Sequence, residues 1–155
     1  MRKIIILVII ATFMLGSCNS KPDYFNKEYK MTNQVWKRFD VFWFDVPVRK
    51  NDVLDFYLPL SHTKEYPLDK FWVNITFYTP DGTTRSRDYD FDLKDKEGNW
   101  LGIQRDGLWK VELPVRKEMP VYEAGICKVR VENKYSKFEL PGVASVGLIA
   151  KKSTP

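Results

Sequence analysis

Phe71-Trp72-Val73-Asn74-Ile75-Thr76-Phe77-Tyr78 is the segment from which the architecture of this chain follows. Its apolar residues at 71, 73, 75 and 77 stand at every second position, and successive side chains of a β-strand point to opposite faces. Thr79-Pro80-Asp81-Gly82 comes next, with the proline, aspartate and glycine of a tight turn, and residues 83–93 then alternate again. This region therefore predicts a β-hairpin with one buried face.

The same alternation recurs along most of the 155 residues. Runs with an apolar residue at every second position occur at 42–46, 54–60, 71–77, 89–93, 109–115, 127–131 and 146–150. No window has the three-and-four spacing of an amphipathic helix. The pattern predicts an all-β fold, a two-sheet β-sandwich of immunoglobulin-like or jelly-roll-like type with about seven or eight strands. Pro59 and Pro114 stand inside two runs, and because proline cannot donate to a β-ladder, we expect those strands to be sheet edges or to bulge.

The N-terminus has the features of an export and lipidation signal. Arg2 and Lys3 precede an apolar run from Ile4 to Leu15, which ends in Leu15-Gly16-Ser17-Cys18. A basic start, a short apolar segment and small residues before the cleavage site are typical of a signal peptide, and the run is shorter than the ~20 residues that span a bilayer. Its end resembles the bacterial lipobox, which implies cleavage before Cys18 and lipid on that cysteine. An ordinary signal peptide that happens to contain a cysteine is the alternative.

These features divide the chain into three predicted parts. Residues 1–17 are the signal peptide, residues 18–33 the lipidated N-terminus and a polar tether, and residues 34–152 the β-sandwich domain. The formal net charge of +5 falls to +3 without Arg2 and Lys3. So small an excess does not indicate a nucleic-acid partner. We expect a domain anchored to a membrane through lipid.

Residues that usually carry catalysis or metal binding are few. His62 is the only histidine, which excludes His-based triads and multi-His metal sites, and we expect it in an exposed loop after a strand. Asp88, Asp90 and Asp92 lack the glycine and the bidentate acid of a calcium loop, so they are expected on a solvated strand face, with metal binding as the alternative. Cys127 alternates with charged residues and is expected as a buried structural thiol rather than a nucleophile. We predict no enzyme activity, no metal and no cofactor.

Aromatic residues give the strongest indication of a binding surface. Four of them stand at strand positions opposite the apolar ones: Trp43, Tyr57, Trp72 and Tyr78. If those strands are consecutive antiparallel neighbours, the four side chains form one exposed patch, a feature that marks partner or ligand sites. Alternatively, residues 24–40 fold over this face and cover it. Trp100 is a further candidate interaction residue. It lies in a long connection, residues 94–108, which is either a functional loop or an excursion that returns Trp100 to the core.

Several short groups carry a resemblance to a known family. In chain order they are Tyr66-Pro67 with Phe71-Trp72, Gly98-Asn99-Trp100-Leu101-Gly102, Gly125 before the strand 126–132, and Leu140-Pro141-Gly142-Val143 before Val146-Gly147-Leu148. Together they resemble the gliding-motility lipoprotein family of the GldH type, found in Bacteroidetes. The resemblance implies a non-enzymatic lipoprotein of the cell envelope that supports gliding motility and the type IX secretion machinery through contacts with other envelope proteins.

Two further expectations follow from the resemblance. The residues after Cys18 lack the acidic cluster that resembles a surface-export signal in these bacteria, so we expect an anchor in the outer membrane that faces the periplasm. The alternative function is a periplasmic or surface module that binds a glycan or a peptide through the aromatic face. An envelope hydrolase has the least support, because the sequence has no catalytic motif.

Replacing Cys18 with alanine is expected to abolish lipidation and cleavage by the lipoprotein route, because the sulfur that accepts diacylglycerol is gone. Labelling cells with a palmitate analogue measures this directly, and the Cys127→Ala variant, which keeps Cys18, serves as the control. Label incorporated by Cys18→Ala would contradict the prediction.

Overall fold

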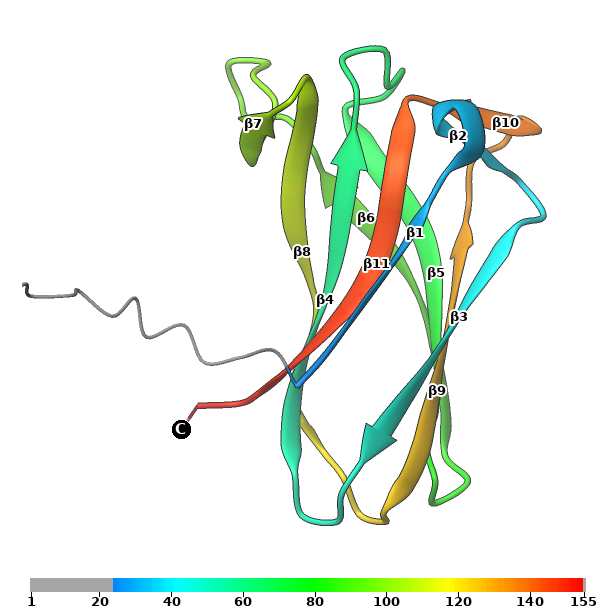
Figure 1. Ribbon diagram of the computed structural model, residues 1–155, viewed down its shortest axis with the longest axis vertical. Helices are drawn as coiled ribbons and strands as arrows, with labels where there is room; N and C mark the ends of the chain where they lie inside the picture. Colours follow the sequence, from blue (N-terminus) through cyan, green and yellow to red (C-terminus); the bar gives the residue numbers. More distant parts are fainter. Residues whose placement is uncertain (1–23, 155) are drawn as a thin grey trace, which may run out of the picture.

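The computed structural model describes residues 24–154, whose regular secondary structure is almost entirely β-strand (Figure 1). They form eleven strands, which make three antiparallel sheets, and one short 3-10 helix, η1 (Thr32–Gln34). The all-β prediction is confirmed, whereas the predicted seven or eight strands are too few. The predicted signal peptide and Cys18 lie outside the described residues.

Two larger sheets and one small ribbon make up the domain. The five-stranded sheet has the order β1-β11-β4-β8-β7, with β1 (Phe25–Lys30), β11 (Val143–Lys152), β4 (Val53–His62), β8 (Leu108–Pro120) and β7 (Ile103–Arg105). The four-stranded sheet has the order β3-β9-β5-β6, with β3 (Val41–Val48), β9 (Gly125–Asn133), β5 (Lys70–Tyr78) and β6 (Thr84–Asp92). The ribbon pairs β2 (Val35–Lys37) with β10 (Glu139–Pro141).

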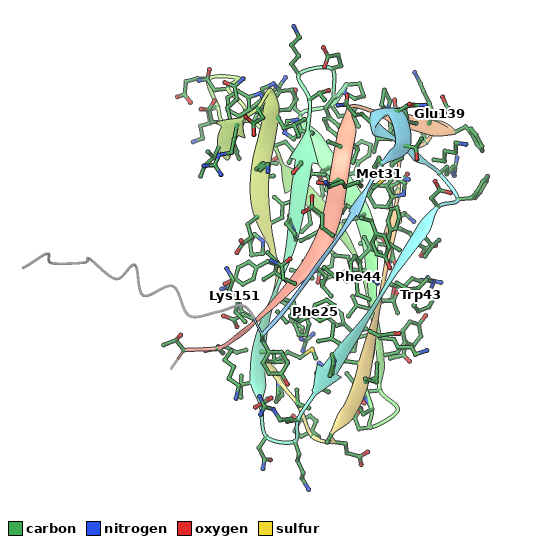
Figure 2. The ribbon with its side chains drawn as sticks, viewed as in Figure 1. Phe25, Met31, Trp43, Phe44, Glu139 and Lys151 are labelled. Atoms are coloured by element: carbon green, nitrogen blue, oxygen red, sulfur yellow. The ribbon has the colours of Figure 1, made fainter. Side chains whose placement is uncertain are left out.

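One hydrophobic core lies between the two larger sheets. Phe56 of β4 and Phe77 of β5 meet across it with ring centroids 5.0 Å apart, and both side chains are buried. Phe44 points into this core from β3, while its neighbour Trp43 points away from it (Figure 2). Burial of a large apolar side chain of this kind contributes about 1.5–3 kcal/mol. The alternation in the sequence thus correctly predicted which side of each long strand is buried.

The folded domain begins earlier than predicted. Residues 25–30 were expected to belong to a tether that ends at residue 33, but they pair with β11 as β1. Phe25 and Tyr29 pack against the core, and the charged Lys27 between them hides the alternation in the sequence. The boundary at residue 34 is therefore wrong, and the domain includes residues 24–33.

The two prolines have different positions. Beyond Lys110, β8 pairs only with β4 among the described residues, so Pro114 lies on a free edge, as predicted. Pro59 lies in β4 between β11 and β8, so the edge prediction is wrong for β4. A Cβ atom on Gly147 of β11 would lie 3.0 Å from the Pro59 side chain and 2.6 Å from the carbonyl oxygen of Lys27. Glycine at 147 therefore permits the close approach of β1, β11 and β4.

Candidate interaction face

The outer surface of the four-stranded sheet has an aromatic cluster at one end. Trp43 of β3 stacks on Tyr78 of β5 with ring centroids 5.8 Å apart, across the intervening strand β9. Arg130 of β9 is the register partner of Trp43, and its guanidinium lies 6.0 Å from the centroid of the Trp43 ring. Lys128 lines a shallow hollow together with the two rings. Trp43 nevertheless remains 45% exposed, although aromatic side chains are usually covered.

The opposite end of this surface carries the second exposed tryptophan. Trp72 Nε1 donates a hydrogen bond to Asp90 Oδ1 at 2.7 Å, and the ring stays 41% exposed. Lys70 Nζ contacts carboxylate oxygens of Asp90 and Asp92 at 3.1 and 3.3 Å, and the hydrogen bond that Lys70 donates to Asp90 raises the pKa of Lys70. These aspartates therefore lie on a solvated strand face, as predicted.

A network of polar side chains fills the space between the two aromatic ends. Asn74 Nδ2 donates to Asp88 Oδ1 at 2.8 Å and to Ser86 Oγ at 3.1 Å. Arg130 is ion-paired with Glu132 at 2.7 Å. The outer surface of β3-β9-β5-β6 thus has an aromatic group at each end and hydrogen-bonding groups in the middle. We call this surface the aromatic face, and its aromatic members are Trp43, Trp72 and Tyr78.

Tyr57 does not belong to the aromatic face. It lies on the outer side of β4 in the other large sheet, where the ammonium groups of Lys117 and Lys151 lie 4.3 and 4.8 Å from its ring centroid. The predicted four-residue patch assumed that β3, β4 and β5 are neighbours. The chain instead crosses to the other sheet after β3 and returns after β4, so the prediction is wrong for Tyr57.

Residues 24–40 leave Trp43 and Trp72 of the aromatic face exposed, and only Arg38 and Phe39 of this segment line a hollow beside its polar centre. Tyr29 of β1 packs on the rings of Phe42 and Phe44, with centroids 4.8 and 5.3 Å apart. Trp36 of β2 is fully buried, and its Nε1 donates to the carbonyl oxygen of Asp40 at 2.8 Å. These aromatics fill the space at the edge of the core, so the predicted alternative of a covering segment is wrong.

Trp100 returns to the body of the domain, away from the aromatic face. Its ring packs on His62 at 4.6 Å between centroids, and the ring of Tyr66 lies 5.4 Å from that of His62. His62 is completely buried, so its predicted position in an exposed loop is wrong. The alternation that begins at Leu54 and continues through Leu60 could have revealed this, because residue 62 falls in the same phase.

Burial controls the chemistry of both His62 and Cys127. His62 Nδ1 donates to the carbonyl oxygen of Thr63 at 2.9 Å, while Nε2 has no hydrogen-bond partner among the described residues. Loss of solvent lowers the pKa of His62. Burial likewise raises the pKa of the free Cys127 thiol to about 11, so the reactive thiolate is disfavoured. Cys127 is therefore a buried structural thiol, as expected from the sequence.

Residues 24–154 contain neither a metal-binding cluster nor a membrane-spanning helix. These residues contain no group of three or more His, Cys, Asp or Glu side chains placed to hold a metal ion. The same residues include no helix of the length and hydropathy needed to cross a membrane.

The fold and the aromatic face define an all-β protein with exposed aromatic side chains on one sheet. The amino-acid sequence identifies the family to which the chain belongs. The chain belongs to the GldH lipoprotein family, whose sequence model matches residues 23–149, as the local motifs had predicted.

A relative and two solved structures complete the comparison. The chain is 22% identical over 157 aligned positions to a protein named gliding motility lipoprotein GldH homolog from Christiangramia forsetii, covering 96% of this chain and 95% of the relative. Among solved structures it is similar to the VP2 subviral particle of infectious bursal disease virus, with a TM-score of 0.37 and 15% identity over 83% of this chain. The Gx strain of the same virus gives a TM-score of 0.31 and 10% identity. The chain spans 32% of either viral chain.

Buried His62 predicts a specific dependence of stability on pH. Because its pKa is lower in the folded protein than the usual 6.5, the unfolded chain binds the proton first as the pH falls. Neutral His62 therefore contributes to the free energy of unfolding in full above about pH 6.5. This contribution is lost as the pH falls below about 6.5, until the lower pKa of His62 in the folded state is reached. Denaturant unfolding at about pH 7.5 and about pH 5 should show a larger loss for the wild type than for His62→Phe. Carboxylates titrate in both proteins, so an equal loss in the two would contradict this prediction.

Proposed function

We propose that this chain is a non-enzymatic lipoprotein of the cell envelope that supports gliding motility and type IX secretion by binding another envelope protein. In this proposal Cys18 carries the lipid, residues 24–152 form a β-sandwich, and the aromatic face contacts the partner. Membership of the GldH lipoprotein family supports the gliding-related role. The observation that carries the interaction role is the stacked, exposed pair Trp43 and Tyr78 beside Arg130.

The composition of the aromatic face supports a protein partner. Tryptophan, tyrosine and arginine are the residues that most often contribute large binding energies at protein interfaces. Trp43 and Tyr78 are already stacked, and Arg130 is held by Glu132, so these side chains lose little conformational freedom on binding. Trp43 on β3 and the pair Trp72 and Tyr78 on β5 are also held in place by the strands of one hydrogen-bonded sheet. Such a rigid surface suits a partner that docks without large rearrangement.

The proposed anchor would keep this surface close to a membrane. Six peptide units separate Cys18 from Tyr24, and a fully extended chain of that length spans about 20 Å. Tyr24 is held to the domain by a hydrogen bond from its hydroxyl group to Asp52 at 2.9 Å. We place the anchor in the outer membrane facing the periplasm, because the residues after Cys18 lack an acidic cluster. The partner is then a protein at the same membrane.

A glycan- or peptide-binding module is the second candidate. The polar network of Asn74, Ser86 and Asp88 favours it, because alternating hydrogen-bonding groups between aromatic platforms suit a sugar chain as well as a protein. Titration with soluble cell-wall fragments would then change the fluorescence of the exposed tryptophans. If the aromatic face binds a protein instead, the cell-wall fragments would leave the tryptophan fluorescence unchanged.

Substitution of the aromatic face tests the protein-binding proposal. Full-length lipoprotein is cross-linked in native membranes and purified, as wild type, Trp43→Ala, Tyr78→Ala and Tyr57→Ala. Both substitutions on the aromatic face should strongly reduce the envelope proteins recovered, because truncation of an aromatic anchor commonly costs about 2 kcal/mol or more of binding. Tyr57→Ala removes an aromatic ring from the opposite sheet and should leave recovery unchanged.

Variant stability is measured alongside, so that unfolding is not mistaken for lost binding. Equal recovery from wild type and both face variants would contradict the proposal. An equal loss in Tyr57→Ala would also contradict it, because the effect would then not be specific to the aromatic face.

A further inference from the structure

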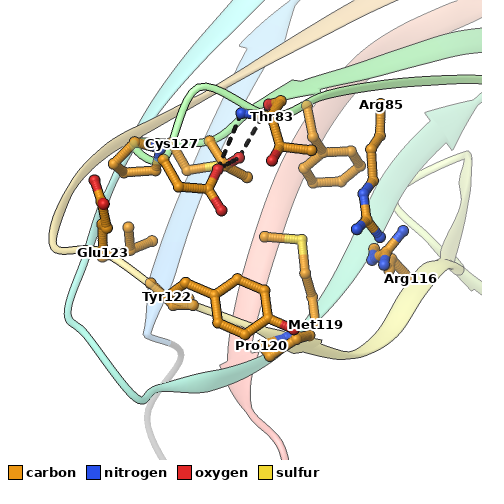
Figure 3. Close-up of a pocket in the computed structure, with 14 residues that line it drawn as sticks. Thr83, Arg85, Arg116, Met119, Pro120, Tyr122, Glu123 and Cys127 are labelled. Carbon is orange, nitrogen blue, oxygen red and sulfur yellow. Dashed lines mark hydrogen bonds between the residues drawn. The ribbon is translucent and has the colours of Figure 1, made fainter.

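A narrow cavity opens between the two large sheets, at the end of the domain where β5 turns into β6 (Figure 3). Its inner wall is apolar and includes the buried side chains of Val48, Phe77, Met119 and Cys127. The cavity volume is ≈ 30 Å³. This space suits a small apolar group and is far too small for a long acyl chain.

Two arginines stand at one side of this cavity. Arg85 comes from β6 and Arg116 from β8, and Figure 3 shows their guanidinium groups together at the same side. Within residues 24–154 neither side chain has a carboxylate oxygen within 4.0 Å of its nitrogens, in contrast to Arg130. Two neighbouring like charges repel each other, and an anion between them removes that cost.

A second observation also favours an acceptor group at Arg116. The Nε atom of Arg116 is buried and has no hydrogen-bond partner among the described residues. A buried donor without a partner costs about 1–3 kcal/mol. Two acidic residues, Asp81 and Glu123, also line the cavity. Figure 3 shows Glu123 on the side away from the two arginines. The Asp81 carboxylate accepts hydrogen bonds from Thr79 and from the backbone nitrogen of Thr83, and these bonds, together with the charge of Arg85, lower its pKa. Asp81 is therefore already used by the turn.

The strands that carry the two arginines both have free edges. Among the described residues β6 pairs only with β5, and β8 beyond Lys110 pairs only with β4. A free edge exposes backbone donors and acceptors that can pair with an added extended segment. Backbone pairing is thus available next to the cavity.

We propose that this cavity binds the C-terminal residue of an extended peptide. Its carboxylate lies between Arg85 and Arg116, and its small apolar side chain enters the space lined by Phe77, Met119 and Cys127. Arginine and carboxylate form the strong, paired hydrogen bonds that this geometry requires. A C-terminal residue joins an acid and an apolar side chain at one carbon atom, which matches a cavity where both recognition groups lie close together. This role does not involve the aromatic face and goes beyond the proposed function.

Methionine methyl groups provide a direct probe of this cavity. The part of the chain that the structure describes has two methionines, Met31 and Met119, and of these Met119 lines the cavity. Full-length lipoprotein with ¹³C-methyl methionine is placed in nanodiscs, which avoids free detergent, and the Met119 signal is assigned with Met119→Leu. N-acetyl-leucine at millimolar concentration should shift the Met119 signal and leave that of Met31 in place. N-acetyl-leucinamide, which has no carboxylate, should shift neither.

Arginine variants complete the test. Arg85→Gln and Arg116→Gln should each weaken N-acetyl-leucine binding about tenfold, the usual effect of losing a charge-assisted hydrogen bond. Arg87→Gln, a substitution on the same strand outside the cavity, should bind like the wild type, and thermal unfolding verifies that each variant is folded. No shift of Met119, an equal shift with the amide, or no effect of either arginine variant would overturn the proposal. A shift with decanoate but not with N-acetyl-leucine would also overturn it, in favour of a fatty-acid site.

Discussion

The contact between Phe56 and Phe77 across the core is the interaction on which the other features depend. It joins the two larger sheets, and because side chains alternate along a strand, it fixes the orientation of every neighbouring residue. With Phe77 buried, its neighbours Thr76 and Tyr78 must point to the outer face of β5, where Thr76 is covered by hydrogen-bonded Asn74 and Ser86. A shift of one residue in register would exchange the two faces. The position of the aromatic face therefore follows directly from the burial of the core.

The two large sheets differ in what they present to solvent. Trp43 and Trp72 remain open on the outer side of the four-stranded sheet, whereas Tyr57 on the other sheet is contacted by two lysines. This asymmetry is the physical reason for assigning the partner-binding role to one sheet. The cavity with Arg85 and Arg116 lies between the sheets at one end, so the domain has two separate surfaces that could act on different partners.

The sequence predicted the features that depend on local alternation, including the seven long strands, buried Cys127 and the exposed aromatics of β3 and β5. It failed where position depends on the path of the chain. Nothing near Tyr57 indicates that β4 joins the other sheet, and Arg85 and Arg116 lie 31 positions apart in the sequence. β1 was missed because Lys27 interrupts its apolar face, while the burial of His62 followed from a pattern that was already visible. Cys18 lies outside the described residues, so its lipidation stays a prediction.

Hydroxyl-radical footprinting tests the central claim, that the aromatic face is open in the isolated protein and covered in the envelope. Oxidation is measured for purified lipoprotein in nanodiscs and for intact cells. We expect Trp43 and Trp72 to be oxidised in the purified protein and protected in cells, while buried Trp36 stays unreactive in both and Tyr57 reacts equally in both. Equal oxidation of Trp43 and Trp72 in the two samples would contradict the account.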